Sequence, residues 1–208
     1  LVLGGGVVGS SAIRVALGIG ADVTVLDRSV SRLGELDEQY RGQLRTVYSM
    51  AEALEVHARE ADLIIGAVLI PGASAPKLVT AEMLADFKPG TVMVDVAIDQ
   101  GGCFETSRPT AHAEPTYVVD GVVHYCVANM PGAVARTATL ALTNATLPYI
   151  MRLASNDVGS LLLEDRHFVA GLNIVHGQLT HRAVAEALGQ MWTEPDQILR
   201  ASLHLKSA

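Results

Sequence analysis

Three glycines and one aspartate carry the first chemical signal in this sequence. Gly4, Gly6 and Gly9 have the spacing G-x-G-x-x-G and follow an apolar run, and Asp27 ends a second apolar run. A turn with this spacing lets backbone N–H groups at a helix N-terminus bind a pyrophosphate. An acidic side chain after the second strand accepts hydrogen bonds from ribose hydroxyls. The pattern therefore predicts a dinucleotide-binding site.

Asp27 also bears on which dinucleotide binds. A carboxylate at this position repels a 2′-phosphate, so the sequence favours NAD over NADP. Arg28 follows directly and would in principle bind that phosphate. The alternatives for Arg28 are a solvated side chain at the strand end or one that lies over the adenine. We expect NAD.

The segments around the glycines are typical of a strand, a turn, a helix and a second strand. Residues 1–3 are an apolar run, residues 7–19 place apolar side chains at helical spacing, and residues 21–26 are rich in β-branched side chains. A lone glycine pattern is a weak signal, and its alternative is a turn that binds nothing; the surrounding unit favours the binding site. The sequence begins directly with this strand and without a methionine. A central parallel strand needs neighbours on both sides and seldom opens a fold, so we expect this chain to be the interior and C-terminal part of a longer enzyme.

Asp99 is the residue best placed for proton transfer. It follows the apolar run VDVAI and precedes Gln100-Gly101-Gly102. Ligands of open α/β sheets bind at the carboxyl ends of the strands, so this carboxylate would face the nicotinamide and accept a proton or orient an ammonium ion or water. The alternative is that Asp99 caps the glycine turn. Asp95 is expected to be structural and to bond neighbouring loop amides.

The remaining pattern predicts an α/β fold, a doubly wound parallel sheet of the Rossmann type followed by helices. Further strands are expected at 44–48, 62–68, 91–99 and 122–127, and helices at 29–39, 50–61 and 80–86. From about Arg136 the sequence becomes helical and apolar, with a kink or interruption before Pro148. We predict an NAD-binding domain over 1–135 and, over 136–208, a helical segment of an incomplete catalytic domain, which packs on the absent part.

Composition narrows the function classes. The chain of 208 residues is 50% hydrophobic but only 4% aromatic, which fits a buried parallel sheet covered by helices. Its net charge of −7, without a basic stripe, argues against a nucleic-acid or anionic-membrane partner. The apolar stretches are too short to span a bilayer. The two cysteines lack C-x-x-C spacing and are expected to stay reduced in the cytoplasm; no Cys/His cluster indicates a metal site.

Longer motifs resemble one enzyme family. The segments VDVAIDQGGCFETSRPT at 94–110 and HYCVANMPGAVARTATLALTNATLPY at 124–149 are similar to alanine dehydrogenases, as are LGGGVVGS, IIGAVLIPGASAPKLV and TYVVDGVVHY. The similarity runs from residue 1 to about residue 189. Ala135 departs from the family, which often has proline there.

The resemblance implies reversible oxidative deamination of L-alanine to pyruvate and ammonia, with NAD as the hydride acceptor, in a homohexamer. Asp99 matches the family's catalytic aspartate, whereas its histidine, lysine and arginine partners belong to the family's N-terminal domain. The expected NAD contacts, from the glycine pattern and the resemblance together, are Gly4, Gly6, Val7, Gly9, Asp27, Arg32, Ser49, Val68, Leu69, Val96, Ala97, Ile98, Asp99, Arg108, Val127, Ala128, Asn129 and Met130.

Several alternatives stay open at this point. The chain is also compatible with the NAD-binding subunit of a proton-translocating transhydrogenase or with a non-enzymatic NAD-sensing module. Asn129 would hold the nicotinamide or the substrate, or else only form a turn. None of the seven histidines is expected to transfer protons; His112, His124 and His176 are expected at the surface or in packing.

Overall fold

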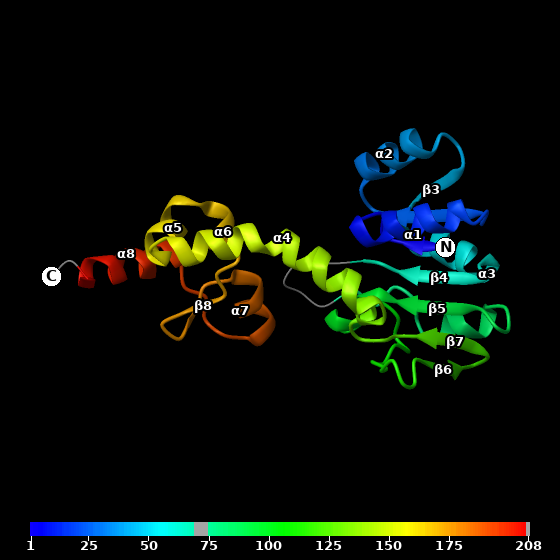
Figure 1. The fold of residues 1–208 in the computed structure, drawn as a ribbon. Coiled ribbons are helices and arrows are strands. Elements are labelled where there is room, and N and C mark those ends of the chain that lie inside the picture. The colour runs from blue at the N-terminus through cyan, green and yellow to red at the C-terminus, as the bar shows by residue number, and fades with distance from the viewer. Residues whose placement is uncertain (69–74, 207–208) are drawn as a thin grey trace. The chain divides into compact units, whose positions relative to one another are not determined.

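The structure, a computed structural model, describes residues 1–68 and 75–206, with side chains described up to Ala201. The contacts between these residues form two compact units, one within residues 1–130 and one within 131–206. Figure 1 shows the elements of both.

The first unit is built on a sheet whose described strands number seven. Their order is β3-β2-β1-β4-β5-β7-β6, and every neighbouring pair is parallel except the β6–β7 hairpin (Figure 1). The strands are β1 (Val2–Leu3), β2 (Val23–Asp27), β3 (Leu44–Tyr48), β4 (Leu63–Gly66), β5 (Val92–Asp95), β6 (Thr116–Val119) and β7 (Val122–Tyr125). The chain builds the sheet outward from β1 in one direction, then returns to place β4 on the other side of β1. The predicted doubly wound α/β fold is confirmed.

Helices connect the parallel strands. They are α1 (Val7–Gly18), α2 (Val30–Tyr40) and α3 (Ala51–Glu60), with 3-10 helices η1 (Glu82–Asp86) and η2 (Val96–Gln100). The strand expected over 91–99 ends at Asp95, because the Asp95 carboxylate accepts a hydrogen bond from the Ala97 N–H and turns the chain into η2. The residues predicted to finish a strand therefore form a helical turn.

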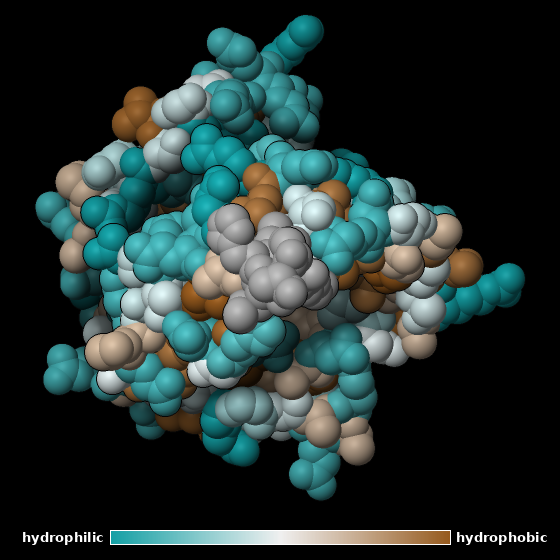
Figure 2. Space-filling model, turned by 90° about the vertical axis from the view of Figure 1, so that its left-hand side faces the viewer, coloured by the Kyte–Doolittle hydropathy of each residue, from teal (hydrophilic) through white to brown (hydrophobic). Residues whose placement is uncertain are grey.

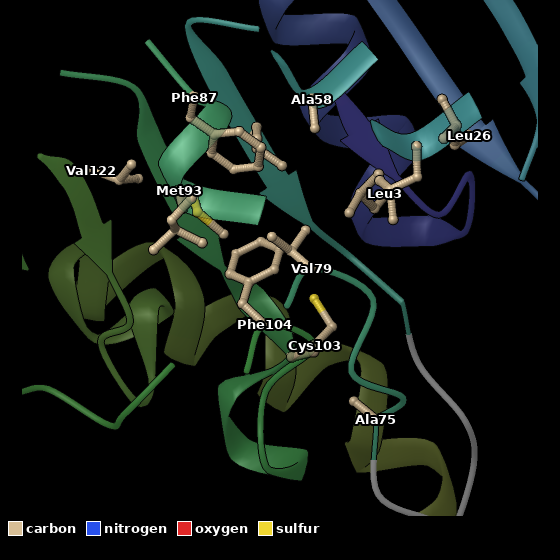
Figure 3. Close-up of a cluster of buried hydrophobic side chains, with 14 residues drawn as sticks. Leu3, Leu26, Ala58, Ala75, Val79, Phe87, Met93, Cys103, Phe104 and Val122 are labelled. Atoms are coloured by element: carbon tan, nitrogen blue, oxygen red, sulfur yellow. The ribbon is translucent and has the colours of Figure 1, made fainter. Parts of the chain in front are cut away.

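Both faces of the sheet are buried at the central strands β1 and β2, which explains the uninterrupted apolar runs there. On one face Leu3, Leu26, Met93 and Phe104 belong to one buried hydrophobic cluster (Figure 3). Val2 and Val25 point to the opposite face and pack on Ile13 and Leu36 of the covering helices. Adjacent strand residues point to opposite faces, so a strand covered on both sides needs apolar side chains at every position.

The second unit is mainly helical. It contains α4 (Ala135–Ser155), α5 (Val158–Glu164), α6 (Arg166–Ala170), the short strands β8 (Ile174–Val175) and β9 (Gln178–Leu179), α7 (Arg182–Leu188) and α8 (Pro195–Lys206); η3 (Met130–Val134) precedes α4. Of the expected kink or interruption before Pro148, the interruption is wrong, because α4 runs through this proline, and the kink stays a prediction. Pro148 lacks only the N–H that would donate to the Asn144 carbonyl, so a single helical hydrogen bond is lost.

None of the residues of α4 is buried, and Leu140, Leu142 and Ile150 are exposed. In the space-filling view, hydrophobic side chains lie at the surface between hydrophilic ones (Figure 2). Among the described residues, no helix combines the length and the hydropathy needed to cross a membrane. The assignment of 136–208 to a catalytic domain, and its packing on a further part, stay predictions.

Gly66 at the end of β4 tests how tightly this core is packed. A Cβ at Gly66 would overlap the Cys103 sulfur and the Phe104 ring, so we expect Gly66→Ala to lower the free energy of unfolding by roughly 1–3 kcal/mol. At Gly34, on α2, a Cβ meets no atom within 4 Å. Gly34→Ala is the control, and its helix preference should raise the free energy of unfolding by roughly 0.5–1 kcal/mol. Urea unfolding measures both, and equal effects would contradict the packing argument.

Candidate dinucleotide-binding site

The glycine turn, residues 4–9, connects β1 to α1 in a conformation that other residues would not adopt. Gly4 has a φ of +97°, and its N–H donates to the Leu26 carbonyl at 2.8 Å. A Cβ at Gly9 would overlap the Gly4 carbonyl, so the helix packs against the turn only because Gly9 has no side chain. Gly6 has open space around it and caps α1 without a side-chain hydrogen bond. The first N–H groups of α1 therefore remain available to a phosphate, beside the exposed Val7.

The Asp27 carboxylate is tied to the glycine turn. Its Oδ2 accepts from the Gly5 N–H at 2.6 Å, and its Oδ1 accepts from the Ser29 N–H at 2.7 Å. Ser49 lies alongside, since its N–H donates to the Asp27 carbonyl at 2.9 Å. Each carboxylate oxygen retains a second acceptor position. Asp27 can thus hold the turn and still accept hydrogen bonds from ribose hydroxyls.

Arg32 holds the same turn from α2. Its Nε donates to the Gly5 carbonyl at 2.7 Å, and a terminal nitrogen donates to the Ser10 hydroxyl, also at 2.7 Å. The other terminal nitrogen pairs with Glu35 at 2.6 Å. The guanidinium that we expected to contact ribose or adenine is thus bonded to protein groups here, and its contact with NAD stays a prediction.

A cavity of about 550 Å³ lies at the carboxyl ends of β1, β2 and β4. Six predicted residues line it: Gly4, Gly6, Val7, Asp27, Ser49 and Val68. The apolar lining residues Leu26, Ala67, Pro76 and Leu78 were not predicted as contacts, although the last three lie in the motif IIGAVLIPGASAPKLV. Leu69 falls outside the described residues.

A second hollow of about 710 Å³ shares Arg28, Ser49 and Leu78 with this cavity. It extends along α3 and residues 77–86. Arg28 therefore lies where the two hollows meet.

Asp95 organises the loop that carries the predicted catalytic residue. This carboxylate is fully buried and accepts from the N–H groups of Ala97, Cys103 and Phe104 at 3.1, 2.9 and 3.3 Å, and from the Ser107 hydroxyl. The expectation that Asp95 bonds neighbouring loop amides is confirmed. Buried charge is tolerated here because several donors converge on it.

Asp99 lies on η2 with its side chain exposed, next to the predicted NAD contacts Val96, Ala97 and Ile98. Within the described part of the chain its carboxylate has no hydrogen-bond partner. The Gly101 N–H donates to the Ile98 carbonyl at 3.0 Å instead, so the turn closes without a cap from Asp99. No described residue therefore competes with a ligand for this exposed carboxylate.

Arg108 is positioned by the β6–β7 hairpin. Its N–H donates to the Tyr117 hydroxyl at 2.8 Å, and its guanidinium carbon lies 4.0 Å from the centre of the Tyr117 ring. That ring stacks on His124 with centroids 4.9 Å apart. Sequence reasoning missed Tyr117. The turn Asp120-Gly121 between two β-branched runs was the signal for a hairpin that would have found it.

The predicted contacts Val127, Ala128, Asn129 and Met130 follow β7. Asn129 has a left-handed φ of 57° and an exposed side chain. Ala128 is fixed by a hydrogen bond from its N–H to the Thr110 carbonyl at 3.2 Å. This geometry supports the turn-forming role of Asn129, and its contact with nicotinamide stays a prediction.

The strand ends just described carry the same segments that resemble a known family. The family model described as alanine dehydrogenase/PNT, C-terminal domain, matches residues 1–182. This chain belongs to that family. The chain is 66% identical to the alanine dehydrogenase of Halomonas elongata over 198 residues, which make up 95% of this chain and 53% of that protein.

Solved structures agree with the family. An L-alanine dehydrogenase structure matches with a TM-score of 0.80 at 48% identity, covering 90% of this chain and 52% of the other. The transhydrogenase of Sinorhizobium meliloti is more distant, with a TM-score of 0.64 at 31% identity over 73% of this chain and 43% of that one. The resemblance seen in the sequence is confirmed. The chain spans about half the length of the curated relatives it matches.

No metal-binding cluster is found in the ranges that the structure describes: three or more His, Cys, Asp or Glu side chains nowhere converge there. The expected absence of a metal site stays a prediction.

His124 provides a pH test of the hairpin packing. His124 is fully buried, and burial lowers the pKa of its imidazole. The folded chain therefore protonates this side chain less readily than the unfolded chain, in which a histidine has a pKa of about 6.5. The stability from neutral His124 is present above that pH and is lost as the pH falls toward the lower folded pKa. We expect the free energy of unfolding to decrease below about pH 6.5, and to decrease less in His124→Phe.

The control for this test is Thr106→Val, which removes the hydroxyl 2.7 Å from His124 Nε2 but keeps the titrating ring. It should lower stability yet retain the pH dependence. Urea unfolding at several pH values measures all three chains. An unchanged slope in His124→Phe would contradict the assignment.

Proposed function

We propose that this chain supplies the NAD site and the catalytic aspartate of an alanine dehydrogenase, which interconverts L-alanine with pyruvate and ammonia. The observation that carries the proposal is the placement of two features at one edge of the sheet. The glycine turn follows β1 and the exposed Asp99 follows β5, and these two strands and β4 between them are parallel, so all three end on the same side. The high identity to a named alanine dehydrogenase supports this proposal.

The residues present fit NAD. Open space at Gly6, free N–H groups at the start of α1 and the cavity of about 550 Å³ suit a pyrophosphate and its adenosine. Asp27 has acceptor positions for the ribose hydroxyls, and its charge opposes a 2′-phosphate. When bound, NAD would accept the hydride from the substrate.

Asp99 would handle the protons of the reaction. Oxidation of alanine requires the amine to lose a proton, and hydrolysis of the resulting imine requires a base for the attacking water. A carboxylate that is exposed, with no hydrogen-bond partner among the described residues, can accept one proton in each of these steps, once it has passed the first proton to solvent. The substrate Cα–H must also lie about 3–3.5 Å from the nicotinamide carbon.

The proposal extends to the other predicted contacts and to the assembly. Arg32, Val96, Ala97, Ile98, Arg108, Val127, Ala128, Asn129 and Met130 are proposed NAD contacts, and residues 136–208 a part of the catalytic domain. The full-length protein, meaning this chain with any part that precedes it, is proposed to be a cytoplasmic homohexamer that binds neither nucleic acid nor membrane. A transhydrogenase or a non-enzymatic sensor is less well supported, given 31% identity to the transhydrogenase and 66% to an alanine dehydrogenase.

The chain of 208 residues should bind NADH more tightly than NADPH, without oxidising L-alanine by itself. Asp27→Asn keeps an acceptor for the turn but removes the charge. We expect it to weaken NADH roughly tenfold, as loss of one charged hydrogen bond implies, and to strengthen NADPH. Isothermal titration calorimetry measures both. Asp22→Asn, at the other end of β2, is the control, and turnover of L-alanine by this chain alone would refute the division of labour.

Asp99→Asn in the full-length protein should lower kcat roughly 10²- to 10⁴-fold, because the amide cannot accept the protons. The affinity for NADH should stay nearly unchanged. Asp120→Asn, in the hairpin turn where asparagine also adopts positive φ, is the matched control. Equal losses of NADH binding and turnover in Asp99→Asn would assign the residue a structural role.

A further inference from the structure

Lys77 makes three hydrogen bonds to the loop that carries Asp99. Its ammonium donates to the carbonyls of Gly101, Gly102 and Phe104 at 2.5, 2.9 and 3.2 Å. The lysine comes from the segment after β4, whereas the carbonyls come from the loop after β5. An ammonium has three N–H donors, so all of them are used on this one loop.

The carbonyls of this loop need a side-chain donor because residues 101–104 belong to no strand of the sheet. Gly101 and Gly102 both have positive φ, at 88° and 75°. A Cβ at Gly102 would press on the Asp95 carboxylate, so the backbone passes directly over that buried group. Asp95 accepts from N–H groups of the loop and Lys77 donates to its carbonyls. The negative Asp95 therefore binds N–H groups and the positive Lys77 binds carbonyl groups of the same irregular loop, residues 97–104.

Backbone hydrogen bonds align the two segments in the same register. The Ala75 N–H donates to the Gln100 carbonyl at 2.9 Å, and the Leu78 N–H donates to the Cys103 carbonyl at 2.7 Å. In return the Glu105 N–H donates to the Val79 carbonyl at 2.8 Å. Lys77 lies between these contacts, so its ammonium is held over the turn that directly follows Asp99.

We propose that Lys77 is a positioning residue that acts through Asp99. By fixing the carbonyls just after Asp99, it sets the direction in which η2 presents the carboxylate to the substrate. The proposal rests on the proposed alanine dehydrogenase function for its kinetic consequence, but the effect on the loop is independent of that function. A misplacement of about 1 Å in such a group can cost a hundredfold in rate.

The kinetic test uses the full-length protein with Lys77→Met, which keeps the length of the side chain but removes the donors. We expect kcat to fall roughly tenfold to a hundredfold, while the dissociation constant of NADH changes little. Lys77→Arg retains N–H donors and should recover part of the rate. In the Asp99→Asn background, Lys77→Met should have almost no further effect, because the group through which it acts is already removed.

The matched control is Lys88→Met. Lys88 also donates to a backbone carbonyl, that of Glu60 at 2.6 Å, and pairs with Asp62 at 3.0 Å, but it precedes β5 and so lies at the amino end of the strands. Its loss should leave kcat unchanged. A similar fall in kcat in Lys88→Met, or full additivity of Lys77→Met with Asp99→Asn, would overturn the proposal.

A second measurement separates this proposal from the proposed function. Hydrogen exchange followed by mass spectrometry should show faster exchange at residues 99–104 in Lys77→Met, with other peptides of the sheet unchanged. If the wild-type protein fails to oxidise L-alanine, the proposed function is refuted while this exchange result still supports the anchoring of the loop. If exchange at residues 99–104 is unchanged, the positioning role is refuted whatever the activity.

Discussion

Parallel strands that end at one edge of a sheet leave the backbone groups of the following loops without ladder partners, and here two carboxylates accept their N–H groups. Asp27 ends β2 and bonds Gly5 and Ser29, while Asp95 ends β5 and bonds Ala97, Cys103 and Phe104. Hydrogen bonds to a charged acceptor are stronger than neutral ones. The side chains at the strand ends therefore set the shape of the loops that form the candidate site. That shape in turn determines which protein groups can contact a ligand.

The two carboxylates differ in what they leave available. Asp95 is fully buried, and its carboxylate oxygens accept hydrogen bonds from protein groups, so its role is structural. Asp27 is only half-buried and borders the cavity, so it serves the turn and a ligand together. Between them the sheet reverses its direction of growth, at β1 and β4. This reversal opens the crevice in which α/β proteins bind nucleotides.

Local sequence predicted the sheet, its helices and the glycine turn because each depends on residues close together in the chain. Apolar runs of β-branched residues mark buried strands, and glycine spacing marks the turn. Contacts between distant segments left no such mark, because the bonds from Arg32 to the glycine turn and from Lys77 to the Asp99 loop depend on which strands become neighbours. Tyr117 under Arg108 was missed although its hairpin turn was visible in the sequence. The end of β5 at Asp95 was likewise missed, since the residues that follow are as apolar as a strand and only the buried carboxylate turns them into η2.

Cys103 gives the Asp99 loop a built-in chemical reporter. Its side chain is fully buried, and its N–H donates a hydrogen bond to Asp95. Burial, and to a smaller extent the nearby charge of Asp95, raises the pKa of its thiol. Thiol reagents attack the thiolate, so their rate depends on both the access to the sulfur and its ionisation. In the closed loop the sulfur is neither exposed nor ionised, so alkylation must wait until the segment detaches from the sheet. The labelling rate of this cysteine thus follows the population of the opened loop, or the opening rate where the reagent outpaces reclosing, without any engineered probe.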